Sequence, residues 1–104
     1  MSEGVEFPCH VELYCDAVDL RKGHHGLLGI VEQELGKDGL NGSLYLFSNR
    51  NRSLIKGLYW DRTGYVVISK RLESGKFCIP FKEDVIELDN KSLRLLLDGL
   101  KLFV

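Results

Sequence analysis

The chain has 104 residues, of which 44% are hydrophobic and 28% charged, with a formal net charge of -1. We expect residues 1–104 to form a single domain, with residues 1–10 as a flexible or loosely packed N-terminus. Three cysteines at unremarkable spacings exclude a disulfide framework and suit a reducing cytoplasm. No segment has the roughly 18 consecutive apolar residues of a membrane span, and no secretory signal is visible. The composition therefore predicts a cytoplasmic protein with no membrane partner.

The first half of the chain predicts one strand and one helix. Val11–Cys15 alternates apolar and polar residues, which favours a short strand. Asp19 is the better of two candidate N-caps for a helix over Leu20–Leu35, where apolar residues recur at helical spacing. This helix would contain Gly23, Gly26 and Gly29 in its interior. Gly36–Ser43 is rich in turn formers and closes the helix.

The second half predicts an antiparallel sheet followed by a helix. Short polar turns separate four strand-like segments: Leu44–Ser48, Ser53–Trp60, Tyr65–Leu72 and Lys76–Ile79. Such close spacing favours a meander in which each strand pairs with its successor. Asp89 caps a second helix that runs through Asp98, with Gly99 as its stop. The predicted fold class is α+β: an antiparallel four-stranded meander with an N-terminal-half helix and a C-terminal helix.

Charge is segregated along the chain. Residues 1–48 hold three basic and eight acidic residues, whereas residues 49–82 hold eight basic residues and only two acids. Because strands reverse between them, the turns at 49–52 and 73–75 should lie at the same end of the meander. That end would collect five cations, which we call the basic pole: Arg50, Arg52, Lys70, Arg71 and Lys76.

Three further cations extend this candidate anion site. Lys56 lies farther along the second strand, and Arg21 and Lys22 are weaker additions because Asp16 and Asp19 are nearby. Arginine suits bidentate phosphate contacts, which favours nucleic acid as the partner. The alternative is that most of these cations are solvated residues of strand faces and turns. Five aromatic residues on the same strands either stack on bases or belong to the core, as strand aromatics more often do: Tyr45, Phe47, Tyr59, Trp60 and Tyr65.

The sequence offers little support for metal or catalytic chemistry. Adjacent His24 and His25 would point about 100° apart on a helix, so they do not readily share a metal. The cysteines lack metal-ligand spacing, and no phosphate-binding loop or nucleophile motif is present. We therefore expect no metal, no cofactor and no catalytic residue. A small metal-independent nuclease that uses His24 with the arginines is a remote alternative.

Three short segments, in order and at a particular spacing, carry a family resemblance. They are Asp19–Gly23 followed by Gly26–Leu27, Leu58–Asp61 with Gly64–Tyr65, and Lys70–Glu73 with Gly75–Phe77. Together they resemble the TnpB-type accessory proteins of bacterial insertion-sequence family sixty-six, which are unrelated to the RNA-guided nuclease of the same name. The resemblance spans about residues 11–100. The chain departs from the family pattern at His24 and His25, where an aromatic or aliphatic residue followed by an acid is common.

The resemblance implies assistance in transposition, beside a separate and larger transposase that carries the acidic catalytic triad. Two non-enzymatic roles follow as hypotheses. In the first, the basic pole contacts phosphates of the element DNA, at the element ends. In the second, the protein is an adaptor that docks onto the transposase without contacting DNA, with residues 100–104 as a candidate apolar contact.

Overall fold

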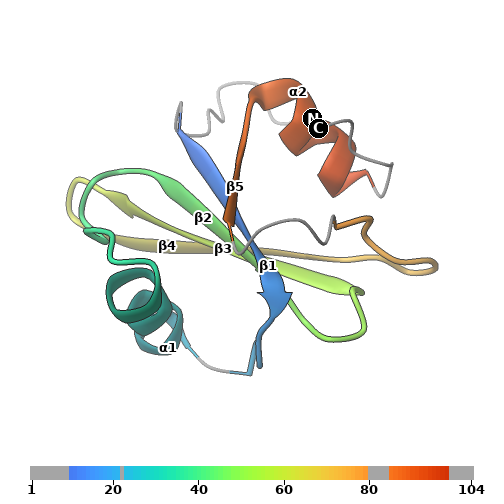
Figure 1. The fold of residues 1–104 in the computed structure, drawn as a ribbon, viewed down its shortest axis with the longest axis horizontal. Helices are drawn as coiled ribbons and strands as arrows, with labels where there is room; N and C mark the ends of the chain where they lie inside the picture. Colours follow the sequence, from blue (N-terminus) through green and yellow to red (C-terminus); the bar gives the residue numbers. More distant parts are fainter. Residues whose placement is uncertain (1–9, 22, 80–84, 99–104) are drawn as a thin grey trace.

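The computed structural model describes residues 10–21, 23–79 and 85–98. Within them a five-stranded sheet has the order β4-β3-β2-β1-β5 (Figure 1). Its strands are β1 (Val11–Ala17), β2 (Leu44–Ser48), β3 (Leu54–Asp61), β4 (Gly64–Arg71) and β5 (Val85–Leu88). β1 and β2 are parallel, and the other neighbours are antiparallel. The sheet is therefore mixed.

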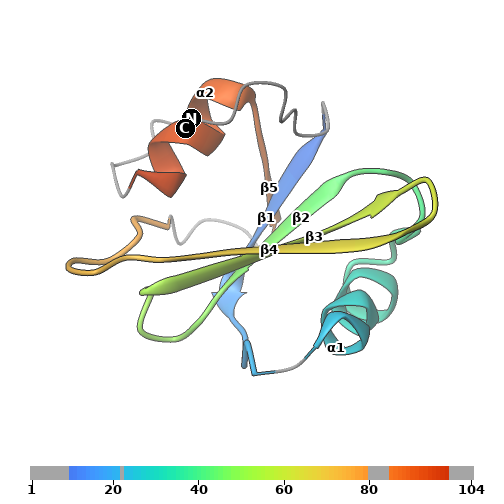
Figure 2. The same cartoon turned by 180° about the vertical axis from the view of Figure 1, so that it is seen from behind.

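Helices cover both faces of the sheet (Figures 1 and 2). Helix α1 (His24–Gly29) continues into a π-helical turn, η1 (Ile30–Glu34), and lies on one face. This pair forms the crossover that the parallel strands β1 and β2 require. Helix α2 (Asn90–Leu97) follows β5 and lies on the other face. We refer to these as the α1 face and the α2 face.

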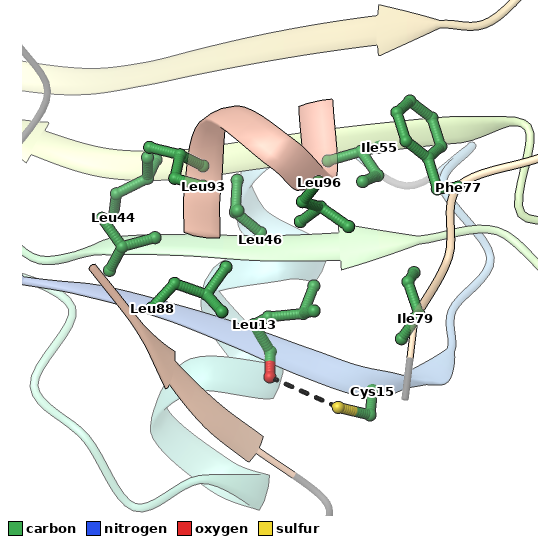
Figure 3. Packing of buried hydrophobic residues seen from close by; sticks show 11 residues of the cluster. Leu13, Cys15, Leu44, Leu46, Ile55, Phe77, Ile79, Leu88, Leu93 and Leu96 are labelled. Atoms are coloured by element: carbon green, nitrogen blue, oxygen red, sulfur yellow. Dashed lines mark hydrogen bonds between the residues drawn. The ribbon is translucent and has the colours of Figure 1, made fainter. Parts of the chain in front are cut away.

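The central strand β2 is buried on both sides because each face has its own helix. Its alternate residues Tyr45 and Phe47 pack in the α1-face core, with Leu27, Val31 and Leu58. On the other side of the strand, Leu44 and Leu46 pack in the α2-face core. Figure 3 shows this second core, which also contains Leu13, Cys15, Ile55, Phe77, Ile79, Leu88, Leu93 and Leu96.

The predicted antiparallel four-stranded meander is correct for β2, β3 and β4 and wrong for the rest of the sheet. The fourth predicted strand, Lys76–Ile79, forms no strand. Its apolar residues Phe77 and Ile79 enter the α2-face core, and the Phe77 amide donates to the Arg52 carbonyl (2.7 Å) instead of extending the ladder. The predicted strand at 11–15 extends to Ala17 and pairs with both β2 and β5.

The N-terminal-half helix is shorter than predicted. Asp19 does not cap it: the helix begins at His24, with Gly23 at the N-cap position. The Asp19 carboxylate instead accepts a hydrogen bond from the Arg21 amide (3.0 Å) and closes a local turn. Leu20 is buried within this turn. Leu20 therefore belongs to the β1–α1 connection, although its spacing from the later apolar residues matched that of a helix.

The predicted C-terminal helix is confirmed as α2. Asp89 occupies its N-cap, and the Asp89 carboxylate accepts a hydrogen bond from the Ser92 amide (2.7 Å). This contact lowers the pKa of Asp89 below its ordinary value, because the hydrogen bonds from Ser92 favour the carboxylate. The predicted stop at Gly99 and the N-terminal residues 1–9 lie outside the described residues.

Candidate nucleic-acid interface

A surface groove of about 750 Å³ lies at the end of the sheet where the β2–β3 turn meets the end of β4. Backbone hydrogen bonds join these segments, from the Leu72 amide to the Ser53 carbonyl (3.0 Å) and from the Phe77 amide to the Arg52 carbonyl (2.7 Å). The turns at 49–52 and 73–75 therefore lie at one end of the sheet, as the meander predicted. The groove is lined by Ala17, Val18, Asp19, Leu20, Arg21, Asn49, Arg50, Asn51, Leu54, Lys56, Ser69 and Arg71.

Asn49 shapes the β2–β3 turn that forms one wall of this groove. The Asn49 side-chain oxygen accepts hydrogen bonds from the amides of Ser53 (2.9 Å) and Leu54 (3.1 Å). Arg52 closes the turn with a φ of 57°, in the left-handed region. This geometry leaves Arg50 exposed at the tip of the turn.

Alternation along β3 and β4 decides which cations reach the groove. Lys56 is opposite Ser69 and Leu54 is opposite Arg71, so these four residues share the α1 face. The Lys56 ammonium donates to the Leu20 carbonyl (2.7 Å) and lies against the β1–α1 connection. Arg50, Lys56 and Arg71 thus come from three parts of the chain and line one groove.

Arg21 also lines the groove, and its charge is paired. Its guanidinium donates two hydrogen bonds to the Asp19 carboxylate, at 2.9 and 2.8 Å. These hydrogen bonds and the charge of Asp19 hold the pKa of Arg21 above its ordinary value. Because Asp19 already neutralises much of this cation, Arg21 contributes less to the field of the groove than Arg50 or Arg71.

Arg52 points into the protein. Its guanidinium donates to the Ser48 hydroxyl and, at 2.7 Å, to the Cys15 carbonyl. Ser48 is fully buried, and the β1–β2 register shifts between Leu13 and Ala17, around Cys15. The Arg52 side chain therefore joins β1 to the β2–β3 turn at the irregular part of the ladder.

Two of the remaining predicted site residues, Lys70 and Lys76, do not line the groove. Lys70 lies on the α2 face, where its ammonium is 4.0 Å from the Asp98 carboxylate at the end of α2. Lys76 is exposed beyond β4 and does not line the groove, and Lys22 lies outside the described residues. The structure thus brings together Arg21, Arg50, Lys56 and Arg71. The sequence did not predict that Ser69 and the β1–α1 residues before Arg21 line the groove, although alternation from Arg71 along β4 indicates Ser69.

The five aromatic residues of the strands also divide between buried positions in the cores and partly exposed positions on the α1 face. Tyr45 and Phe47 are buried in the α1-face core, and Tyr59 packs against the α2-face core. Trp60 and Tyr65 are half-buried on the α1 face, with ring centroids 5.0 Å apart in an edge-to-face arrangement.

The part of the chain that the structure describes lacks a cluster of metal-ligating side chains. Its His, Cys, Asp and Glu side chains form no group of three or more that could hold a metal ion. His24 and His25 pack ring against ring, with centroids 4.0 Å apart. None of the described helices has the length and apolar character needed to cross a membrane.

Comparison with known proteins identifies the family. The model of the family described as IS66 Orf2 like protein matches residues 9–103. The chain belongs to the IS66 Orf2-like family. Membership associates this IS66 Orf2-like protein with an accessory role in transposition, as its sequence segments predicted.

Two similar proteins come from Sinorhizobium fredii. The uncharacterized protein y4jC is 33% identical over 84 residues, which cover 80% of this chain and 72% of that protein. The uncharacterized protein y4hO is 34% identical over 83 residues, covering 79% of this chain and 72% of that protein. No solved structure matches the chain.

Proposed function

We propose that this IS66 Orf2-like protein is a non-catalytic accessory factor for transposition that contacts phosphates of the element DNA. The contacts would be made in the groove lined by Arg50, Lys56 and Arg71, which we call the basic groove. The observation that carries the proposal is the convergence of Arg50, Lys56 and Arg71 on one concave surface. Arg50 and Arg71 are both exposed, so their guanidinium groups can make bidentate phosphate contacts. Lys56 adds a point charge on the groove side of β3.

Phosphate contacts of this kind give affinity with little sequence preference, because they do not read base edges. Each neutralised phosphate releases counterions, so the logarithm of the affinity falls with the logarithm of the salt concentration. The slope of this fall is proportional to the number of contacts. Three contacts predict a slope of about -2.7 in a plot of log affinity against log salt for duplex DNA.

The test is fluorescence anisotropy with duplexes of the element-end sequence and of a scrambled sequence, across a salt series. The double variant Arg50→Ala/Arg71→Ala should bind both duplexes more weakly and lower the steepness of the salt dependence by about two. The matched control is Lys91→Ala/Arg94→Ala, which removes the same charge from exposed positions of α2. We expect the control to retain the wild-type slope.

Two results would argue against the groove as a DNA site. One is equal weakening by both double variants, which would indicate a response to net charge alone. The other is no binding to any DNA at low salt. Pull-down of the purified transposase without DNA would then favour the adaptor role.

A further inference from the structure

The α1 face of β4 connects the basic groove to an exposed group of rings. β4 is one of the two edge strands of the sheet, and alternate residues along it share this face. We call these residues the β4 strip: Tyr65, Val67, Ser69 and Arg71. Ser69 and Arg71 line the groove, and Val67 is 43% exposed, so the strip is open to solvent along its middle.

At the other end of the strip, four ring side chains pack against one another. The Trp60 ring meets Tyr65 edge to face at 5.0 Å between centroids, and the His24 ring lies 6.0 Å from Tyr65. His25 in turn lies 4.0 Å from His24. We call this set the ring cluster. Both histidines are exposed, and Trp60 and Tyr65 are half-buried, so the rings are held in place and still partly accessible.

We infer that the surface formed by the basic groove, the β4 strip and the ring cluster binds single-stranded DNA, with bases stacked on the ring cluster. This inference rests on the proposed function and specifies the form of DNA. A cationic track beside aromatic rings is the combination that binds single strands, because phosphates follow the charges and bases stack on the rings. From Arg71 to Tyr65 the strip spans six residue steps, or about 20 Å, a length that a few extended nucleotides can follow.

A duplex fits this surface less well. Its bases are stacked on one another, so their faces cannot reach Trp60 or Tyr65 unless the helix opens. Reading a duplex through the major groove requires a protein helix or ribbon that enters it. On the α1 face the described helix α1 has six residues and packs over the sheet through buried Leu27.

Acidic residues define the path of the nucleic-acid backbone. The Tyr65 hydroxyl and the Glu32 carboxylate both lie beside Gly39, on the side of Tyr65 away from the groove. The pKa of Tyr65 is raised by burial and by the charges of Glu32 and Asp38. Phosphates would be repelled from that side of Tyr65. The backbone therefore follows the outer edge of β4, and the bases face the ring cluster.

Trp60 supplies a direct readout, because it is the only tryptophan in the chain. The experiment titrates the full-length protein with an unlabelled 12-nucleotide single strand and with a hairpin duplex of matched sequence, at the same salt. We expect the single strand to quench Trp60 fluorescence to saturation and to bind at least about tenfold more tightly than the duplex.

A tyrosine pair provides the matched variants. Tyr65→Leu should weaken single-strand binding about tenfold and change duplex binding by less than about twofold, because it removes a stacking surface. Tyr59→Leu makes the same change on the α2 face of the neighbouring strand and should alter neither affinity. Val67→Glu serves as a second variant at an exposed position, where the new charge should also repel the strand.

The outcomes separate this inference from the proposed function. Two results would overturn the inference and leave duplex binding by the groove intact. One is equal affinity for the single strand and the duplex. The other is single-strand binding that neither quenches Trp60 fluorescence nor weakens in Tyr65→Leu or Val67→Glu. Absence of binding to either form at low salt would overturn both. The inference would be supported if the single strand quenches Trp60 fluorescence and binds more tightly than the duplex, and if Tyr65→Leu or Val67→Glu removes this preference.

Discussion

The two faces of the sheet differ at their basic end, although each face receives a cation from the last two residues of β4. On the α1 face, Arg71 is exposed and lines the groove with Arg50 and Lys56. On the α2 face, the preceding residue Lys70 lies 4.0 Å from Asp98 at the end of α2. Adjacent cations on β4 therefore have different surroundings, because successive side chains of a strand point to opposite faces.

The β2–β3 turn shows the same contrast between Arg50 and Arg52. Arg50 is exposed at the groove, whereas Arg52 bonds to the buried Ser48 and to the Cys15 carbonyl. A count of basic residues in sequence therefore overstates the anion-binding surface. Strand alternation and turn geometry select which cations face a ligand.

The largest expected effect is on DNA affinity. Arg71→Glu should weaken binding by at least about tenfold at low salt, because it replaces a phosphate contact with a repulsive charge. Lys70→Glu makes the same change in net charge on the α2 face and should weaken binding by less than about threefold. Anisotropy titrations of the two variants give the comparison, and equal losses would refute the separation of the faces.

The next effect is on stability. Arg52→Ala should lower the free energy of unfolding by about 2 kcal/mol, because it removes charged hydrogen bonds to Ser48 and to the Cys15 carbonyl. Arg50→Ala should change it by less than about 0.5 kcal/mol. Urea unfolding measures both, and a stable Arg52→Ala protein would show that this side chain does not join β1 to the turn.

A smaller effect concerns the helix that covers the α2 face. Asp89→Ala should lower the Tm by a few degrees, because the Ser92 amide loses its acceptor at the N-cap. The folded-state pKa of Asp89 is lowered, so its contribution is present above the ordinary Asp value of about 3.9 and is lost as the pH falls through the lowered pKa. Thermal melts should show a smaller difference between wild type and variant at pH 2.5 than at pH 7.

Asp19 offers the contrast to Asp89 at the other helix. Its carboxylate closes a turn and binds Arg21 without capping α1. Asp19→Ala should therefore lower the Tm less than Asp89→Ala. A larger loss would indicate that the β1–α1 connection matters more for stability than the α2 cap.

The smallest effect is that of the ion pair on the α2 face. Lys70→Ala should change the free energy of unfolding by less than about 0.5 kcal/mol, because both side chains are about half exposed at 47% and 58%. The change should shrink further in high salt. A loss well above this value in urea unfolding would mean that Lys70 has a structural role comparable to that of Arg52.

Local sequence patterns predicted the elements that follow from the spacing of residues along the chain. The strands β2, β3 and β4 were predicted as strand-like segments between polar turns, and α2 from its Asp89 cap and leucine spacing. The family was likewise predicted from short ordered segments, and the match over residues 9–103 confirms it. Sequence also identified Arg50 and Arg71 as candidate contacts, with Lys56 and Arg21 as further additions. It gave Arg52 and Lys70 the same weight as Arg50 and Arg71.

Long-range pairing decided the rest, because no local signal specifies which strand lies beside which. The parallel pairing of β1 with β2 depends on the α1–η1 crossover, and β5 pairs with β1 across most of the chain. The α2-face core takes up Phe77 and Ile79, which removes the predicted fourth strand of the meander. The inward position of Arg52 likewise depends on Cys15, 37 residues away in sequence. Sequence by itself therefore determined the local elements, the segregation of charge and the family, while only the tertiary structure decided which cations and rings share the α1 face.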